Sequence, residues 1–233
     1  MDTYFDLGGY SFPVTTQSTE AQTWFDRGIL WTYGYNHEEA VTCFERAIDA
    51  DPKCAMAHWG AGYAVGPNYN MPWDLFDYAG RAAAARAGYA HARKALDLID
   101  GVTRWEAALI HALPARHPQP DPLNPEAMKA WNADFADAMR DVFAAHPENH
   151  EVRTVFAESL LNLTPWKMWD LTSGQPAAGA RTVEAQTVLE EALEGDSSAM
   201  HHPGLLHLYV HLMEMSPFPE KALKAGEIGR AHV

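Results

Sequence analysis

Three side chains near the end of the chain have residue types and a spacing that suit metal binding. His207, His211 and Glu214 are four and three residues apart, in a segment expected to be helical from Pro203 onward. At about 100° per residue, this spacing places all three on one face of a helix. Imidazole and carboxylate groups bind transition metals such as zinc, copper or iron. The pattern indicates a metal site, with His202, just before the helix, as a further candidate ligand.

The same histidines also have a structural interpretation, in which they hydrogen-bond to loops or line the groove of a helical array. A zinc protease would place glutamate next to the first histidine, as His-Glu-x-x-His, whereas this chain has Leu208 there. Metalloprotease activity is therefore not expected. Two hypotheses stay open: a binding protein without enzymatic activity, and a metal-binding protein whose reaction, if any, the sequence does not define.

Two turn-rich stretches, residues 66–73 and 164–169, combine aromatic side chains with amides or prolines. Aromatic walls with a few amide groups are typical of small-ligand pockets. The candidate ligand-binding residues are His37, Asn68, Tyr69, Asn70, Trp73, Trp166 and Trp169. The alternative is that these stretches fill a gap left by an interrupted array of helices.

Helices are the elements that must position these residues. Seven residues between 21 and 54 have the spacing of two amphipathic helices joined by a tight turn: Trp24, Gly28, Trp31, Ala40, Phe44, Ala47 and Pro52. Gly28 allows the partner helix to approach closely, and Phe44 fills the wedge between the two helices. Pro52 ends the second helix. Gly62 recurs 34 residues after Gly28, which indicates an internal repeat.

This pattern resembles the tetratricopeptide repeat, a helical pair of about 34 residues. The segments NHEEA, CAMAHWG, GPNYN, LTPW and HPGLLHLYVH extend the resemblance, over residues 21–225, to a family of long bacterial tetratricopeptide-repeat proteins. The resemblance implies an all-α, right-handed α-solenoid of TPR-like helical pairs, irregular at two long aromatic loops. It also implies a scaffold that binds a protein or peptide partner in its concave groove. The positions that it marks for attention are His37, Asn68, Asn70, Trp166, His202, His207 and His211.

Composition changes along the chain indicate its organisation. We expect an N-terminal lead-in over 1–20 and helical pairs over 21–113. A stiff connector over 114–125 contains five prolines in twelve residues, and further helical pairs follow over 126–226. The last residues, 227–233, match one reading frame of a widely used sequencing adapter. We therefore expect a non-native tail on the N-terminal part of a longer protein.

Charge and cysteine content restrict the class of partner. The formal net charge of -14 disfavours nucleic acid and anionic membrane surfaces as partners. The two cysteines, Cys43 and Cys54, are too few for a disulfide framework and favour a reducing cytoplasm. No apolar run reaches the ~18 residues of a membrane span. These features predict a cytoplasmic protein that binds a protein or peptide. The scaffold hypothesis requires no cofactor, and the oligomeric state is left open.

Overall fold

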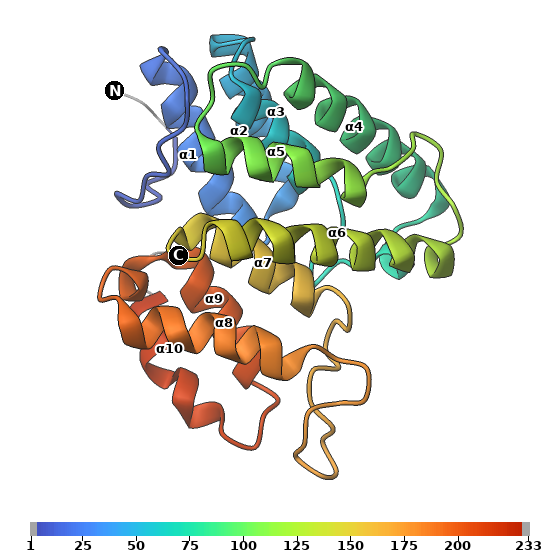
Figure 1. Cartoon of the computed structure of the whole chain (residues 1–233), viewed down its shortest axis with the longest axis vertical. Coiled ribbons are helices and arrows are strands. Elements are labelled where there is room, and N and C mark those ends of the chain that lie inside the picture. Colours follow the sequence, from blue (N-terminus) through green and yellow to red (C-terminus); the bar gives the residue numbers. More distant parts are fainter. Residues whose placement is uncertain (1–3, 230–233) are drawn as a thin grey trace.

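The chain folds into helices, as the apolar spacing predicts. This computed structural model describes residues 4–229, and within them isolated bridges are present but no β-strand (Figure 1). The α-helices are α1 (Thr19–Tyr33), α2 (His37–Ala50), α3 (Ala55–Ala64), α4 (Tyr78–Asp97), α5 (Arg104–Arg116), α6 (Pro125–Ala145), α7 (His150–Leu161), α8 (Thr182–Gly195), α9 (Pro203–Met213) and α10 (Leu223–Gly229). Three short 3₁₀ segments are η1 (Trp73–Leu75), η2 (Ala199–His201) and η3 (Pro219–Ala222).

Side-chain caps explain where several helices begin. Ser18 accepts a hydrogen bond from the amide of Ala21 at the start of α1. Thr103 and Glu106 form a reciprocal capping box at the start of α5. These contacts satisfy backbone amides that have no partner within the helix.

The first two helices pack as the spacing of small residues predicts. A Cβ atom on Gly28 would lie 2.6 Å from Cε1 of Phe44, so only glycine lets the ring reach the α1 backbone. Ala40, Phe44 and Ala47 are fully buried on α2. The same ring contacts Gly60 of α3. One phenylalanine therefore holds three helices together.

Consecutive helices pack against each other, and odd-numbered helices also contact one another. Contacts join α1 to α3, α3 to α5 and α7 to α9. α1 also contacts α9, so the first and last of the odd-numbered helices meet. In Figure 1, α2 to α5 lie toward one end of the molecule and α8 to α10 toward the other, with α6 and α7 between them. No helix in the described part is both long and apolar enough to cross a membrane.

One expected boundary differs from the structure. α5 continues through Pro114 to Arg116, inside the segment expected to be a connector. A proline in the last turn removes only one helical hydrogen bond, so the helix continues through it.

The two ends of the chain are described in part. The lead-in is described from Tyr4 onward, so residues 1–3 lie outside the described part. Of the expected tail, residues 227–229 belong to α10, and residues 230–233 lie outside the described residues. The expected non-native origin of this tail stays a prediction.

Candidate functional site

The two aromatic loops and the histidine face meet around Tyr69. The ring centroid of Tyr69, in the loop after α3, lies 5.0 Å from that of His211 on α9 and 6.2 Å from that of Trp166 in the loop after α7. Tyr35, which follows α1, stacks on His211 at a centroid distance of 5.4 Å. Residues from four parts of the chain therefore form one cluster beside the C-terminal ends of α1, α3 and α7.

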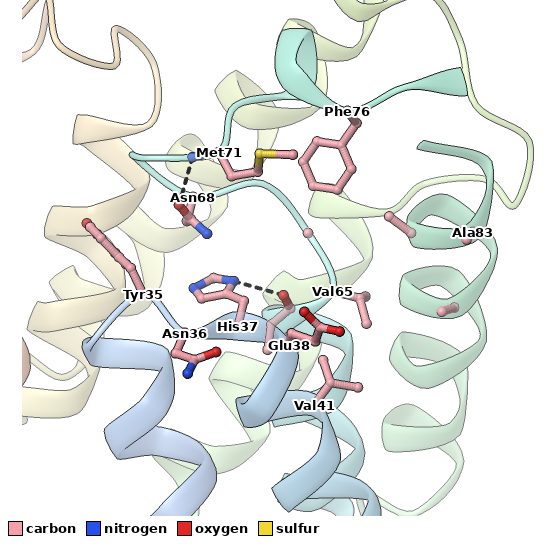
Figure 2. A pocket seen from close by; sticks show the side chains of 14 residues that line it. Tyr35, Asn36, His37, Glu38, Val41, Val65, Asn68, Met71, Phe76 and Ala83 are labelled. Carbon is pink, nitrogen blue, oxygen red and sulfur yellow. Dashed lines mark hydrogen bonds between the residues drawn. The ribbon is translucent and has the colours of Figure 1, made fainter. Parts of the chain in front are cut away.

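A cleft of about 560 Å³ lies next to this cluster, between the start of α2, the loop after α3, and α4 (Figure 2). Its apolar walls are formed by Val41, Val65, Met71, Phe76, Ala83, Ala84 and Ala87. The α4 wall consists of alanines, and larger side chains at these positions would fill the space. Tyr35, Asn36, His37 and Asn68 form the polar end, and the Glu38 carboxylate also lines the cleft (Figure 2). An apolar cleft with a few converging polar groups is the usual form of a small-molecule site.

His37 lines the cleft and holds a buried, unprotonated ring nitrogen on the side of Tyr35 (Figure 2). Its Nδ1 donates a hydrogen bond to the Ala64 carbonyl at 2.8 Å, which fixes the tautomer. Burial lowers the pKa of His37 to about 4, so the ring is neutral at pH 7. Its Nε2 atom is buried without a hydrogen-bond partner among the described residues. Because buried polar atoms are normally paired, this nitrogen is an acceptor suited to a ligand.

Asn68 supplies a donor beside this acceptor. Its side-chain oxygen accepts hydrogen bonds from the backbone amides of Asn70 and Met71, both at 2.9 Å. These bonds assign the orientation of the amide, because only the oxygen can accept. The Nδ2 group therefore lies on the other side, and Figure 2 shows it directed toward His37.

His207 and His211 direct their Nε2 atoms at each other, with 3.0 Å between them. Nδ1 of His207 donates to the backbone carbonyl of Tyr33. Nδ1 of His211 lies 3.0 Å from Oε1 of Glu214. The Tyr35 ring lies against both imidazoles, with its centroid 4.7 Å from that of His207. Burial lowers the pKa of His207. The predicted helical face thus brings His207, His211 and Glu214 together, but Glu214 contacts the outer nitrogen of His211.

His202 does not join this pair. Its Nδ1 accepts a hydrogen bond from the Leu205 amide, so His202 caps α9. Its Nε2 lies 3.3 Å from Oε1 of Glu151 and 2.9 Å from the Tyr10 hydroxyl. Tyr10 and Tyr33 both donate to the carboxylate of Glu151. The four-residue metal set expected from the sequence is therefore not assembled. Within residues 4–229, no three His, Cys, Asp or Glu side chains are grouped as metal ligands.

No protein-family model, curated protein or solved structure matches this chain. Its function is therefore inferred from the side chains that the fold brings together.

The structure contains a buried polar cluster between α3, α5 and α7 that the sequence analysis did not predict. The Tyr63 hydroxyl donates to the carboxylate of Glu158, and the Arg116 guanidinium lies 4.6 Å from the centroid of the Tyr63 ring. Burial raises the pKa of Glu158, and the charge of Arg116 opposes that rise. Tyr63 and Glu158 could have been noticed as polar residues within apolar helices. Arg116 gave no such signal, because it lies in the proline-rich segment.

The remaining candidate residues have different environments. Trp73 is buried in a small apolar cluster, and Asn70 is exposed. Trp169 is buried and donates from Nε1 to the Leu212 carbonyl at 2.6 Å, which is a structural role. Trp166 is 40% exposed and, with Trp73, lines a second cleft of about 360 Å³. The first loop therefore contributes Asn68 and Tyr69 to the site, and the second contributes Trp166.

Proposed function

We propose that this protein binds a small organic molecule in the cleft beside His37. The ligand has an apolar body and a head group that both donates and accepts hydrogen bonds, such as a primary carboxamide. One observation carries the proposal: His37 holds a buried, unprotonated and unpartnered Nε2 atom at the polar end of an apolar cleft. The Asn68 amide supplies the complementary donor.

The energetics favour a ligand that donates to His37. A buried polar atom without a partner costs about 1–3 kcal/mol, and a donated hydrogen bond offsets that cost. Each Å² of ligand apolar surface buried against the alanine and valine walls adds about 25 cal/mol. A carboxamide on a small aromatic ring combines both contributions.

We also propose that the helices form a tetratricopeptide-like solenoid of five pairs, from α1–α2 to α9–α10. The order of contacts supports this arrangement, because the first helix of one pair contacts the first helix of the next in three cases. Gly62 supports it too. A Cβ atom there would lie 3.1 Å from Cβ of His91 on α4, as one on Gly28 would lie against α2. The proposed ligand site then lies beside the C-terminal ends of α1 and α3, the first helices of the first two pairs.

A peptide partner is the second candidate. Met71, Leu75 and Tyr78 are 37%, 53% and 73% exposed, next to the cleft or on the segment that leads from it into α4. Such apolar side chains favour a peptide that lies over this segment and inserts one side chain into the cleft. The space between α3, α5 and α7 offers less room for a peptide, because Tyr63 and Arg116 are buried against each other there.

Benzamide is a suitable probe for the small-molecule proposal. Titration followed by ¹⁵N NMR should shift the resonances of residues lining the cleft. Methyl benzoate, which accepts but cannot donate a hydrogen bond, should bind at least tenfold more weakly, because His37 then stays unpaired. Asn68→Asp keeps the oxygen that holds the loop but removes the donor, and it should weaken benzamide binding about tenfold, or by about 1.4 kcal/mol.

Filling the cleft provides the control. The double variant Ala83→Leu/Ala87→Leu adds two large side chains to the α4 wall and should abolish benzamide binding. Ala90→Leu adds the same side chain to α4 outside the cleft and should leave binding unchanged. Benzamide shifts that persist in the double variant, or equal affinity for both probes, would contradict the proposal. Retained binding of a peptide by the double variant would contradict the peptide candidate.

A further inference from the structure

We propose that His207 and His211 form a two-imidazole site for a divalent transition-metal ion, which they coordinate through their Nε2 atoms. This site is separate from the cleft beside His37. The two Nε2 atoms lie 3.0 Å apart on adjacent turns of α9. With metal–nitrogen bonds of about 2.0–2.1 Å, such a pair subtends an angle of about 95° at the ion. That angle lies between octahedral and tetrahedral values.

The outer nitrogens, Nδ1 of both rings, have the hydrogen-bond partners that are typical of metal-binding histidines. Histidines that bind metals characteristically donate their other N–H group to a backbone carbonyl or a carboxylate, which fixes the tautomer. Nδ1 of His207 donates to the Tyr33 carbonyl. Nδ1 of His211 donates to the Glu214 carboxylate at 3.0 Å. Both rings therefore have the outer partners of metal ligands, one of each type.

The inner nitrogens require a cation between them. Because both Nδ1 atoms donate, each neutral ring directs the lone pair of its Nε2 atom at the other ring. Two lone pairs at 3.0 Å repel, so the arrangement requires a proton between the nitrogens, or a metal ion bound to both and placed to one side of the line that joins them. Glu214 supplies a negative charge within reach of the pair, which favours a cation there.

Aromatic packing holds the pair in position before an ion arrives. The Tyr35 ring lies 4.7 Å from His207 and 5.4 Å from His211, measured between centroids. Tyr69 also contacts the pair, with its ring centroid 5.0 Å from that of His211. Ligands that are already oriented lose little entropy on binding. The side chain of His211 is 15% exposed and that of Glu214 is 39% exposed, so an ion reaches the pair from solvent.

Glu214 and His202, which the sequence pattern offered as metal ligands, have other roles in the structure. Glu214 orients His211 and is a positioning residue, and His202 belongs to the separate cluster around Glu151. Two protein ligands leave the remaining coordination positions to water or to donor atoms of a small molecule.

Calorimetric titration of the full chain, purified without a histidine tag and stripped of metal, tests the site with Zn²⁺ and Ni²⁺. We expect one ion per chain. His211→Gln and His207→Gln should each weaken binding at least tenfold. Glu214→Gln should weaken it about tenfold, because the outer partner of His211 loses its charge. Co²⁺ should give a visible absorption band that is lost in both histidine variants.

Matched variants exclude other sources of binding. His201→Gln removes an exposed histidine that precedes α9, and His91→Gln breaks the pair that His58 and His91 form with Nδ1 atoms 3.3 Å apart. Both variants should bind the ion as the original chain does. Ala83→Leu/Ala87→Leu should also retain it, which separates this site from the cleft.

The proposal is overturned if the original chain binds no ion at 1 mM Zn²⁺. Unchanged affinity in both His207→Gln and His211→Gln would overturn it as well. Circular dichroism of each variant without metal establishes whether it is folded. If His207→Gln unfolds because the contact with Tyr33 is lost, the more exposed His211→Gln still decides the outcome.

Discussion

His37 and His117 each donate a hydrogen bond from one ring nitrogen to a backbone carbonyl. Of the two, it is His37 that lines the cleft described above. Nε2 of His117 lies 2.9 Å from the Gly62 carbonyl, and the ring is fully buried between α3 and α4. Burial, followed by the charge of Arg116, lowers the pKa of His117 to about 3. A buried histidine with a lowered pKa is therefore not in itself evidence of a binding site. The cleft beside His37 makes the difference.

His117 makes stability depend on pH. The unfolded chain takes up a proton at this residue below pH 6.5, whereas the folded chain does so only below about pH 3. The unfolded state therefore gains protons first, and the free energy of unfolding falls as the pH drops through this window. Urea unfolding at pH 6.5 and pH 5.0 should show a loss about 1.5 kcal/mol larger for the original chain than for His117→Gln, whose side chain does not titrate. Equal losses would contradict this assignment.

Helix packing in the first pair depends on the absence of a side chain. Gly28 and Gly60 lie on two different helices, and both contact the ring of Phe44. Glycine is unfavourable within a helix by about 1 kcal/mol relative to alanine. The close approach of the Phe44 ring explains why glycine occurs at both positions.

Gly28→Ala should destabilise the protein by about 1–3 kcal/mol despite the better helix propensity of alanine, because the new methyl group overlaps Phe44. Gly195→Ala in α8 is the control: a Cβ atom there meets nothing within 4 Å, and stability should change little. Adding Phe44→Leu to Gly28→Ala should cost less than the sum of the two single changes, because the smaller side chain makes room. Denaturant unfolding of the four proteins measures this coupling. Strict additivity would show that the two residues do not compete for space.

At the scale of the whole molecule, one carboxylate connects distant parts of the chain. Glu151 at the start of α7 accepts from Tyr10 in the N-terminal lead-in and from Tyr33 in α1. Its Oε1 atom also lies 3.3 Å from Nε2 of His202 at the start of α9. α1 and α9 are themselves in contact, so Glu151 stabilises the junction at which the first and last odd-numbered helices meet.

Glu151→Gln should loosen this junction, because the new amide N–H group would face the hydroxyl groups of Tyr10 and Tyr33, which are also donors. Hydrogen exchange should accelerate at residues 10–14 and 202–206 more than in α4, and stability should fall by about 1.5–3 kcal/mol. Glu148→Gln, at an exposed position before the same helix, should leave exchange unchanged. Uniform acceleration, or none, would contradict a local role for Glu151.

Local spacing in the sequence was sufficient to predict the helices, the wedge of Phe44 and the meeting of His207 with His211. These features depend on residues a few positions apart, or on the apolar face of a single helix pair. Only the tertiary structure decided that Tyr69 meets Trp166, since their contact depends on how α3 and α7 are placed by the helices between them. The same packing separates His202 from the histidine pair. Helix periodicity is encoded locally, whereas the position of a side chain relative to a distant helix depends on the packing of the whole chain.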